Sequence, residues 1–134
     1  MMNITLSQAE MVLAAAKAKA EKMNLKMNIS VVDIGANLTN FARMDDAWLG
    51  SLDISIKKAK TAIFFQMDTA ELGKLVQPGK PLYAIEHSNG GLITFPGGVL
   101  LKDANGIIIG AIGVSGSTVD DDHEVAEAGA KAVK

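Results

Sequence analysis

The sequence predicts an α+β fold, in which one antiparallel sheet is flanked by helices. Short apolar strands follow one another in pairs joined by tight glycine- and asparagine-containing turns, which is typical of antiparallel neighbours. Segments with helical apolar spacing stand before, between and after these strands. The predicted order is α-β-β-α-α-β-β-β-α. A chain of 134 residues is too short for two sizeable cores, so residues 1–134 are expected to form one domain.

A helix is expected over about residues 7–23. Thr5 and Ser7 each precede a Gln or Glu by three residues, which is the capping-box spacing. The apolar stripe that follows has helical spacing and consists of Ala9, Val12, Leu13, Ala16, Ala20 and Met23. A second apolar surface lies off this stripe and consists of Met11, Ala14, Ala15 and Ala18. This second surface predicts a homo-oligomer, at least a dimer, because a monomer would expose it.

The middle of the chain predicts a hairpin and then two helices. Strands over residues 28–33 and 38–43 flank a turn in which Gly35 and Asn37 tolerate a positive φ. Ser51 is expected to cap a helix over 52–65, and Asp68 begins a short helix that ends near residue 76. The segment QPGKP, residues 77–81, predicts an irregular loop because proline and glycine do not hold helix geometry.

The last third predicts a second hairpin, a long strand and a helix. The hairpin strands are 91–95 and 99–103, joined by Pro96, Gly97 and Gly98. Asn105 and Gly106 then turn the chain into a strand over residues 107–115. A final helix is expected from about Thr118, with Ser117 or Thr118 as its cap.

Composition excludes several classes of function. A net charge of −2 and an aromatic content of 4% provide neither a basic field nor stacking platforms, so we expect no nucleic-acid partner. The chain has no cysteine, which excludes disulfides and thiolate metal sites. The N-terminus lacks the pattern of a signal peptide, and no run approaches the roughly 20 apolar residues of a membrane span. We therefore expect a soluble, cytoplasmic protein without a membrane partner.

The glycine-rich run GIIIGAIGVSGSTVDDDHEVAEAG, residues 106–129, superficially looks like a phosphate-binding loop. Its glycines follow the spacing Gly110-x-x-Gly113-x-x-Gly116, which matches neither a dinucleotide fingerprint nor a P-loop. The helix that follows opens with Asp120, Asp121 and Asp122, whose charges would repel a phosphate at the positive end of the helix dipole. The run is therefore interpreted as strand, cap and helix, with a small-ligand turn at 115–117 as the alternative.

Three segments carry candidate ligand-binding residues. Arg43, Asp45 and Asp46 place opposite charges at a strand end, either to grip a polar ligand or to pin the loop by an ion pair. Lys58 could point toward the same loop, whereas Lys57 and Lys60 are expected to be solvated. The wall of the pocket would come from Phe95, Gly97 and Gly98, whose backbone amides are uncovered, and from Ser115 and Gly116. One pocket between 43–47, 95–99 and 115–117 is therefore expected.

The two histidines leave alternatives open. His123, Glu124 and Glu127 share a helical face with Asp120, which is either a weak metal site or a solvated acidic surface. His87 stands beside a predicted turn, so it is an exposed loop residue or a ligand that needs partners from elsewhere. No catalytic triad can be assembled from these residues, because the G-x-S-x-G elbow is absent.

Five blocks, in order, resemble the haem-degrading domain family, formerly a domain of unknown function, which includes GlcG-like, HbpS-like and PduO C-terminal-like proteins. The blocks are VVDIGANL, RMDDA, ISIKKAKTA, GGV and IGAIGVSGSTVDDDHEVAEAG, and the resemblance covers nearly the whole chain. It implies a profilin-like fold around a five-stranded antiparallel sheet. It also implies dimers or larger oligomers and, in some members, binding of haem, corrinoid or iron.

The resemblance implies a small-molecule or tetrapyrrole-binding protein, accessory to a catabolic pathway. Two alternatives stay open: an enzyme acting on haem or on a small hydroxy acid or diol, and a structural oligomer that supports a partner enzyme. Haem-binding members use an N-terminal histidine as an axial ligand, but residues 7–28 contain none. His87 is then the possible haem ligand, with Met23 and Met27 as weaker donors.

Overall fold

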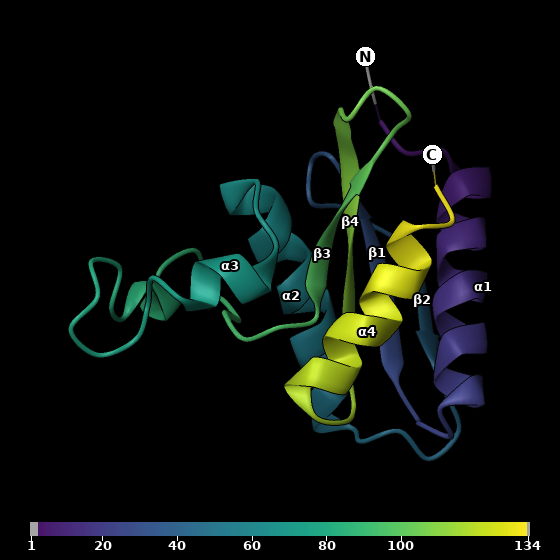
Figure 1. The fold of residues 1–134 in the computed structure, drawn as a ribbon, viewed down its shortest axis with the longest axis horizontal. Helices are drawn as coiled ribbons and strands as arrows, with labels where there is room; N and C mark the ends of the chain where they lie inside the picture. Colours follow the sequence, from purple (N-terminus) through teal and green to yellow (C-terminus); the bar gives the residue numbers. More distant parts are fainter. Residues whose placement is uncertain (1–2, 134) are drawn as a thin grey trace.

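The computed structural model describes residues 3–133, which form helices on both faces of an antiparallel sheet (Figure 1). In chain order the elements are α1 (Leu6–Lys22), β1 (Asn28–Asp33), β2 (Leu38–Arg43), α2 (Gly50–Phe65), α3 (Thr69–Gly73), the 3₁₀ helix η1 (Ile85–His87), β3 (Gly98–Lys102), β4 (Ile108–Ser115) and α4 (Val119–Ala130). The strand order is β2-β1-β4-β3, with every neighbouring pair antiparallel. The predicted α+β class with an antiparallel sheet is confirmed.

The predicted number of strands is wrong, because the described residues contain a sheet of four strands rather than five. Residues 91–95, expected as a hairpin strand, direct their backbone groups elsewhere. The amide of Ile93 donates to Thr61 Oγ1 at 3.2 Å, and the amide of Leu92 donates to the Glu86 carbonyl at 3.0 Å. The segment therefore docks on α2 and η1, and the order of regular elements becomes α-β-β-α-α-β-β-α.

The predicted helix caps are confirmed at two of four sites. Asp68 stands at the start of α3 but makes no cap hydrogen bond, because its carboxylate accepts the Leu100 amide at 2.9 Å. Thr5 and Gln8 form a reciprocal capping box at α1, and Thr118 Oγ1 accepts the Asp121 amide at α4. Ser51 is not a cap: α2 begins at Gly50 without a side-chain cap, and Ser51 is buried. Since Ser51 lies one residue inside the helix, its hydroxyl is no longer at the position from which a cap bonds the first turn.

The two faces of the sheet are packed differently. On one face, α1 and α4 lie side by side and bury the apolar stripe of α1, whose buried members are Ala9, Val12, Ala16 and Ala20 (Figure 1). On the other face, α2 packs through small residues such as Ala59 and Ala62 against Val32 and Ala111. Small side chains allow α2 to approach the sheet closely.

An arm formed by α3 and residues 74–97, which contain η1 and are otherwise irregular, projects from the sheet (Figure 1). The predicted irregular segment 77–81 lies within it and contains no helix or strand. Most of the arm's side chains are exposed, Tyr83 and His87 among them. Among residues 3–133, no helix has the length and apolar character needed to cross a membrane.

Gly113 in β4 sets the distance between α2 and the sheet. A Cβ at this position would overlap the Ser55 carbonyl oxygen and lie 2.7 Å from the Ala59 amide nitrogen, both in α2. Because these are backbone atoms, the clash can be relieved only by moving the helix.

We therefore expect Gly113→Ala to lower the free energy of unfolding by about 1–3 kcal/mol or more, as overpacking does. Urea denaturation followed by circular dichroism measures the change. Gly50→Ala is the matched control, because a Cβ at Gly50 would have no atom within 4 Å. Equal urea midpoints for the two variants would show that the close approach of α2 is not a constraint.

Candidate functional site

The structure divides the single predicted pocket into two separate places. Arg43 and Asp45 line a cavity beside α1. Lys58 and Phe95 lie instead at the start of β3, together with Gly97 and Gly98. The prediction that Lys58 points toward the Arg43 loop is therefore wrong.

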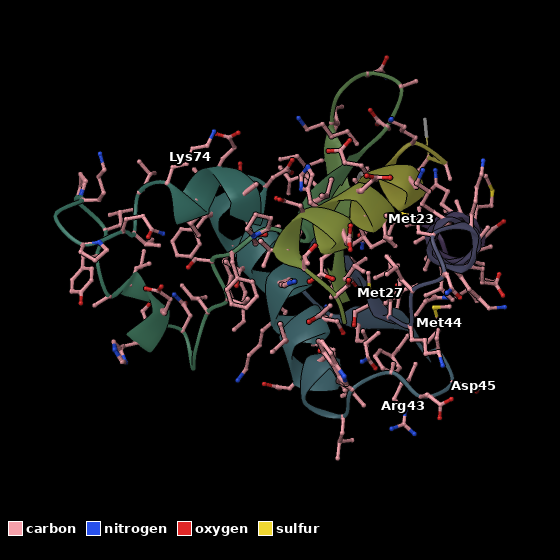
Figure 2. All side chains as sticks on the ribbon, turned by 60° about the horizontal axis from the view of Figure 1, so that its bottom comes forward. Met23, Met27, Arg43, Met44, Asp45 and Lys74 are labelled. Atoms are coloured by element: carbon pink, nitrogen blue, oxygen red, sulfur yellow. The ribbon has the colours of Figure 1, made fainter. Side chains whose placement is uncertain are left out.

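The cavity beside α1 has a volume of about 520 Å³ and an amphipathic lining. Its floor is half-buried and apolar, and its exposed rim is charged. The floor consists of Leu25, Ala42 and Met44, and the rim of Lys17, Glu21, Asn24, Lys26, Arg43 and Asp45. Figure 2 shows Arg43, Met44 and Asp45 together at one end of the molecule, with Lys74 far away on the arm. Such a lining suits a ligand with an apolar body and charged edges.

Arg43 makes no ion pair with any residue between 3 and 133, so the predicted alternative of a loop-pinning pair does not form. Lys26 pairs with Asp46 at 3.5 Å, but both side chains are exposed and the pair is worth little. A guanidinium presents a planar fork of donors that matches a carboxylate. At the rim of a cavity, this fork is available to an anionic ligand.

The cavity floor is tied to the end of the sheet by two methionines. Met27 is fully buried, and its amide donates to Met44 Sδ at 3.4 Å. Gly116 packs on the same residue: a Cβ at Gly116 would lie 3.1 Å from Met27 Sδ and 2.5 Å from the Lys26 carbonyl. Ser115, in register with Asn28, ends β4 at this edge. Ser115 and Gly116 thus support the floor from behind and do not line the cavity.

Lys58 forms a buried ion pair that joins helices from opposite faces of the sheet. Its side chain is inaccessible to solvent, and Nζ donates to Asp122 Oδ2 of α4 at 2.9 Å and to the Val114 carbonyl at 2.8 Å. The Phe95 ring covers the ammonium, with its centroid 4.9 Å from Nζ. This geometry satisfies a cation–π contact. The Val114 carbonyl, Asp122 and the Phe95 ring surround Nζ, so Lys58 is not presented to an external ligand as the sequence suggested.

Asp122, predicted only to complement the dipole at the start of the last helix, is 2% exposed. Its Oδ1 accepts the Ser117 amide at 3.0 Å, which fixes the turn between β4 and α4. Burial raises the pKa of Asp122 and lowers the pKa of Lys58, since desolvation outweighs the attraction between the two charges. The Lys58–Asp122 pair, called the internal strut below, therefore links α2 to α4 through the interior of the protein.

Gly97 and Gly98 make room for this strut and do not form an open pocket wall. Gly97 has φ +130°, and a Cβ there would lie 2.6 Å from Lys58 Nζ. The Gly98 amide, expected to be uncovered, donates to Thr69 Oγ1 at 2.9 Å. The two glycines are therefore explained by packing.

The candidate metal residues line one shallow cavity together with Asp120, but they do not form a metal-binding arrangement. His123 Nε2 lies 3.4 Å from Glu127 Oε1, and Glu124 pairs with Lys19 of α1 at 3.2 Å. Within residues 3–133, no group of three or more His, Asp or Glu side chains is arranged to hold a metal ion. His87 lies in η1 on the arm, exposed and away from the cavity lining.

Comparisons with known proteins agree on one family. A family described as "Haem degrading protein HbpS-like" matches residues 4–131. An uncharacterized 15.0 kDa protein of Citrobacter freundii, from the dhaT-dhaS intergenic region, is 44% identical over 92% of this chain and 87% of its own length. The crystal structure of a PduOC:heme complex superimposes with a TM-score of 0.92 and 34% identity, over 98% of this chain and 96% of that one.

The corrinoid adenosyltransferase PduO of Citrobacter freundii is 36% identical over 98% of this chain, but the match spans only 39% of that enzyme. The adenosyltransferase name describes a protein more than twice as long as the matched region. Its activity is therefore not carried over to this chain.

We expect Lys58→Met to lower the free energy of unfolding by about 3–5 kcal/mol, because the Asp122 carboxylate would stay buried without its partner. The double variant Lys58→Met, Asp122→Asn is expected to lose less free energy of unfolding than the sum of the two single losses, since the two sites are coupled.

Lys57→Met is the control: Lys57 pairs with Asp53 at a partly exposed position, where a loss of at most about 1 kcal/mol is expected. Strict additivity in urea denaturation would contradict the strut.

Proposed function

Because the chain belongs to the HbpS-like family of haem-degrading proteins, we propose that it binds a tetrapyrrole, accessory to a catabolic pathway, in the cavity beside Arg43. The observation that carries this proposal is the Arg43 guanidinium, which has no ion-pair partner among residues 3–133 and lines a cavity with an apolar floor. The similarity to a PduOC:heme complex supports the ligand class.

The chemistry of a tetrapyrrole matches the two parts of the lining. Its macrocycle is a flat apolar body that gains free energy by covering Leu25, Ala42 and Met44. Its polar periphery would remain at the rim, where Arg43 and two lysines stand. The volume of about 520 Å³ falls within the roughly 300–1,000 Å³ of small-molecule sites.

The residues present fit the ring better than they fit a central metal. The cavity lining, all of it within the described residues, contains no histidine, and its one soft donor is the Met44 thioether. That sulfur already accepts the Met27 amide. A bound haem or corrinoid would supply a redox-active metal, while this chain's own residues hold the periphery and exclude water from one face of the ring.

Assembly into a homo-oligomer, at least a dimer, is a further part of the proposal. Three of the four residues of the second apolar surface of α1, Met11, Ala14 and Ala18, are exposed, with Met11 at 52%. Tyr83 on the arm is 62% exposed, and Trp48 and Leu49 before α2 are 65% and 74% exposed. Contact with a second copy would remove this apolar area from water, at roughly 25 cal/mol per Å² before the cost of association.

In a haemin titration, we expect a saturable shift of the Soret band with weak affinity. Arg43→Gln is expected to raise the Kd about tenfold, because a charge-assisted hydrogen bond to a carboxylate is worth about 1.5–3 kcal/mol. Lys74→Gln is the control: it removes an equal charge from the arm and is expected to leave the Kd unchanged (Figure 2). His87→Ala tests the histidine that the sequence favours.

A tight six-coordinate spectrum lost in His87→Ala would move the site to the arm. Equal effects of Arg43→Gln and Lys74→Gln would show that only overall charge matters. Bleaching of bound haemin by peroxide or a reductant, beyond that of free haemin, would favour the enzymatic alternative.

Light scattering at tens of micromolar is expected to give at least twice the 14.0 kDa mass of one chain. The physical reason is the exposed apolar area on α1 and the arm. A mass of 14.0 kDa under these conditions would count against assembly.

A further inference from the structure

We propose that the cavity recognises the carboxylates of a porphyrin and not its metal, so that a metal-free porphyrin binds as well as haem. This inference rests on the proposed function and names the ligand class of the same site. It also separates porphyrins from corrinoids, whose rim carries neutral amides in place of free carboxylates.

The first argument is the arrangement of donor atoms around the cavity. Strong ligands for porphyrin iron in proteins are histidine nitrogen, thiolate and tyrosinate, with methionine sulfur as a partner to histidine. The chain has no cysteine, and its two histidines and one tyrosine lie outside the lining. Met44, in the floor, is the only lining side chain of this group, and its sulfur is engaged by the Met27 amide. A ring lying on this floor gains little from a central metal.

The second argument is the arrangement of charge at the rim. Lys17 and Arg43 have no ion-pair partner among residues 3–133, and the only partner of Lys26 there is the exposed Asp46. Glu21 and Asp45 stand on the same rim, so the lining is not a uniformly positive surface. In such a mixed rim, recognition depends on short-range geometry, and the bidentate fork of Arg43 fits a carboxylate specifically. A neutral amide offers Arg43 no charge-assisted pair.

The third argument is the rigidity of the floor. Met27 is fully buried, and the Gly116 backbone packs against it. Asp122 holds the neighbouring Ser117 amide. Moving Met44 so that its sulfur approaches a metal would break its contact with the Met27 amide, which has no other acceptor in the described part of the chain. Ligation by this sulfur would thus cost a partly buried hydrogen bond.

The test compares haemin, metal-free protoporphyrin IX and hydroxocobalamin on the full chain. Haemin is followed by Soret absorbance and the metal-free ring by fluorescence anisotropy. We expect Kd values for the two porphyrins within about threefold, a rise of about tenfold for both in Arg43→Gln, and no displacement of either by hydroxocobalamin. Met44→Leu keeps an apolar side chain of similar volume in the floor but removes the sulfur, so it is expected to change the Kd values of both porphyrins by the same factor and to leave their ratio unchanged.

Each contrary result identifies what has failed. Haemin that binds at least tenfold more tightly than the metal-free ring, with the difference abolished in Met44→Leu or His87→Ala, would show metal ligation and overturn this inference alone. Displacement by hydroxocobalamin would overturn the carboxylate selectivity. If neither porphyrin binds, the proposed function falls, and this inference falls with it.

Discussion

The buried pair between Lys58 and Asp122 is the interaction on which the site depends. The Lys58 side chain runs past the edge of the sheet beside Gly97 and Gly98, and it connects α2 on one face to α4 on the other. Asp122 in turn holds the Ser117 amide, which fixes the turn at Gly116. Gly116 packs against Met27, whose amide positions Met44 in the cavity floor. A chain of contacts thus runs from the internal strut to the candidate ligand site.

Burying such a pair between two helices carries a large desolvation cost. Removing both charges from water costs several kcal/mol for each, and the directions of the pKa changes at Lys58 and Asp122 show that their attraction does not fully offset this cost. What the pair gains is specificity, because the ammonium can be satisfied only where the Val114 carbonyl, Asp122 and the Phe95 ring converge. A purely apolar contact would tolerate α4 in several positions.

The sequence predicts the regular elements well because local rules determine them. The capping box at Thr5 and the short apolar runs bounded by turn residues are recognised directly from neighbouring residues. The missing fifth strand shows where local rules fail. Residues 91–95 have strand-like composition, but their amides bond Thr61, which is far away in the sequence on α2, and Glu86 in the 3₁₀ helix η1. No pattern within residues 91–95 indicates that the Ile93 amide will bond a helix hydroxyl in place of a carbonyl from a neighbouring strand.

The candidate site is predictable only in part, for a related reason. Arg43 and Asp45 stand out because opposite charges at a strand end are a local signal. Lys17 and Glu21 lie on the exposed surface of α1, where charged residues are ordinary, and only the packing of α1 beside β2 places them at the cavity. Asp122 is hidden among three consecutive aspartates that all suit a helix N-terminus. The distance between Lys58 and Asp122 along the sequence does not indicate that they pair, because only the folded sheet brings them together.

The electrostatics of the cavity explain why short-range recognition suits this protein. Asn24 and Leu25, just beyond the C-terminus of α1, line the cavity, so the negative end of the helix dipole lies beside it. The rim lysines and Arg43 must first offset this field and the carboxylates of Glu21 and Asp45. With a net charge of −2 on the whole chain, little long-range attraction remains for an anion. In the proposed complex, affinity for a carboxylate would then come from direct pairing with Arg43 once the apolar ring covers the floor. The apolar contact would select a flat ring, and the guanidinium would select its carboxylates.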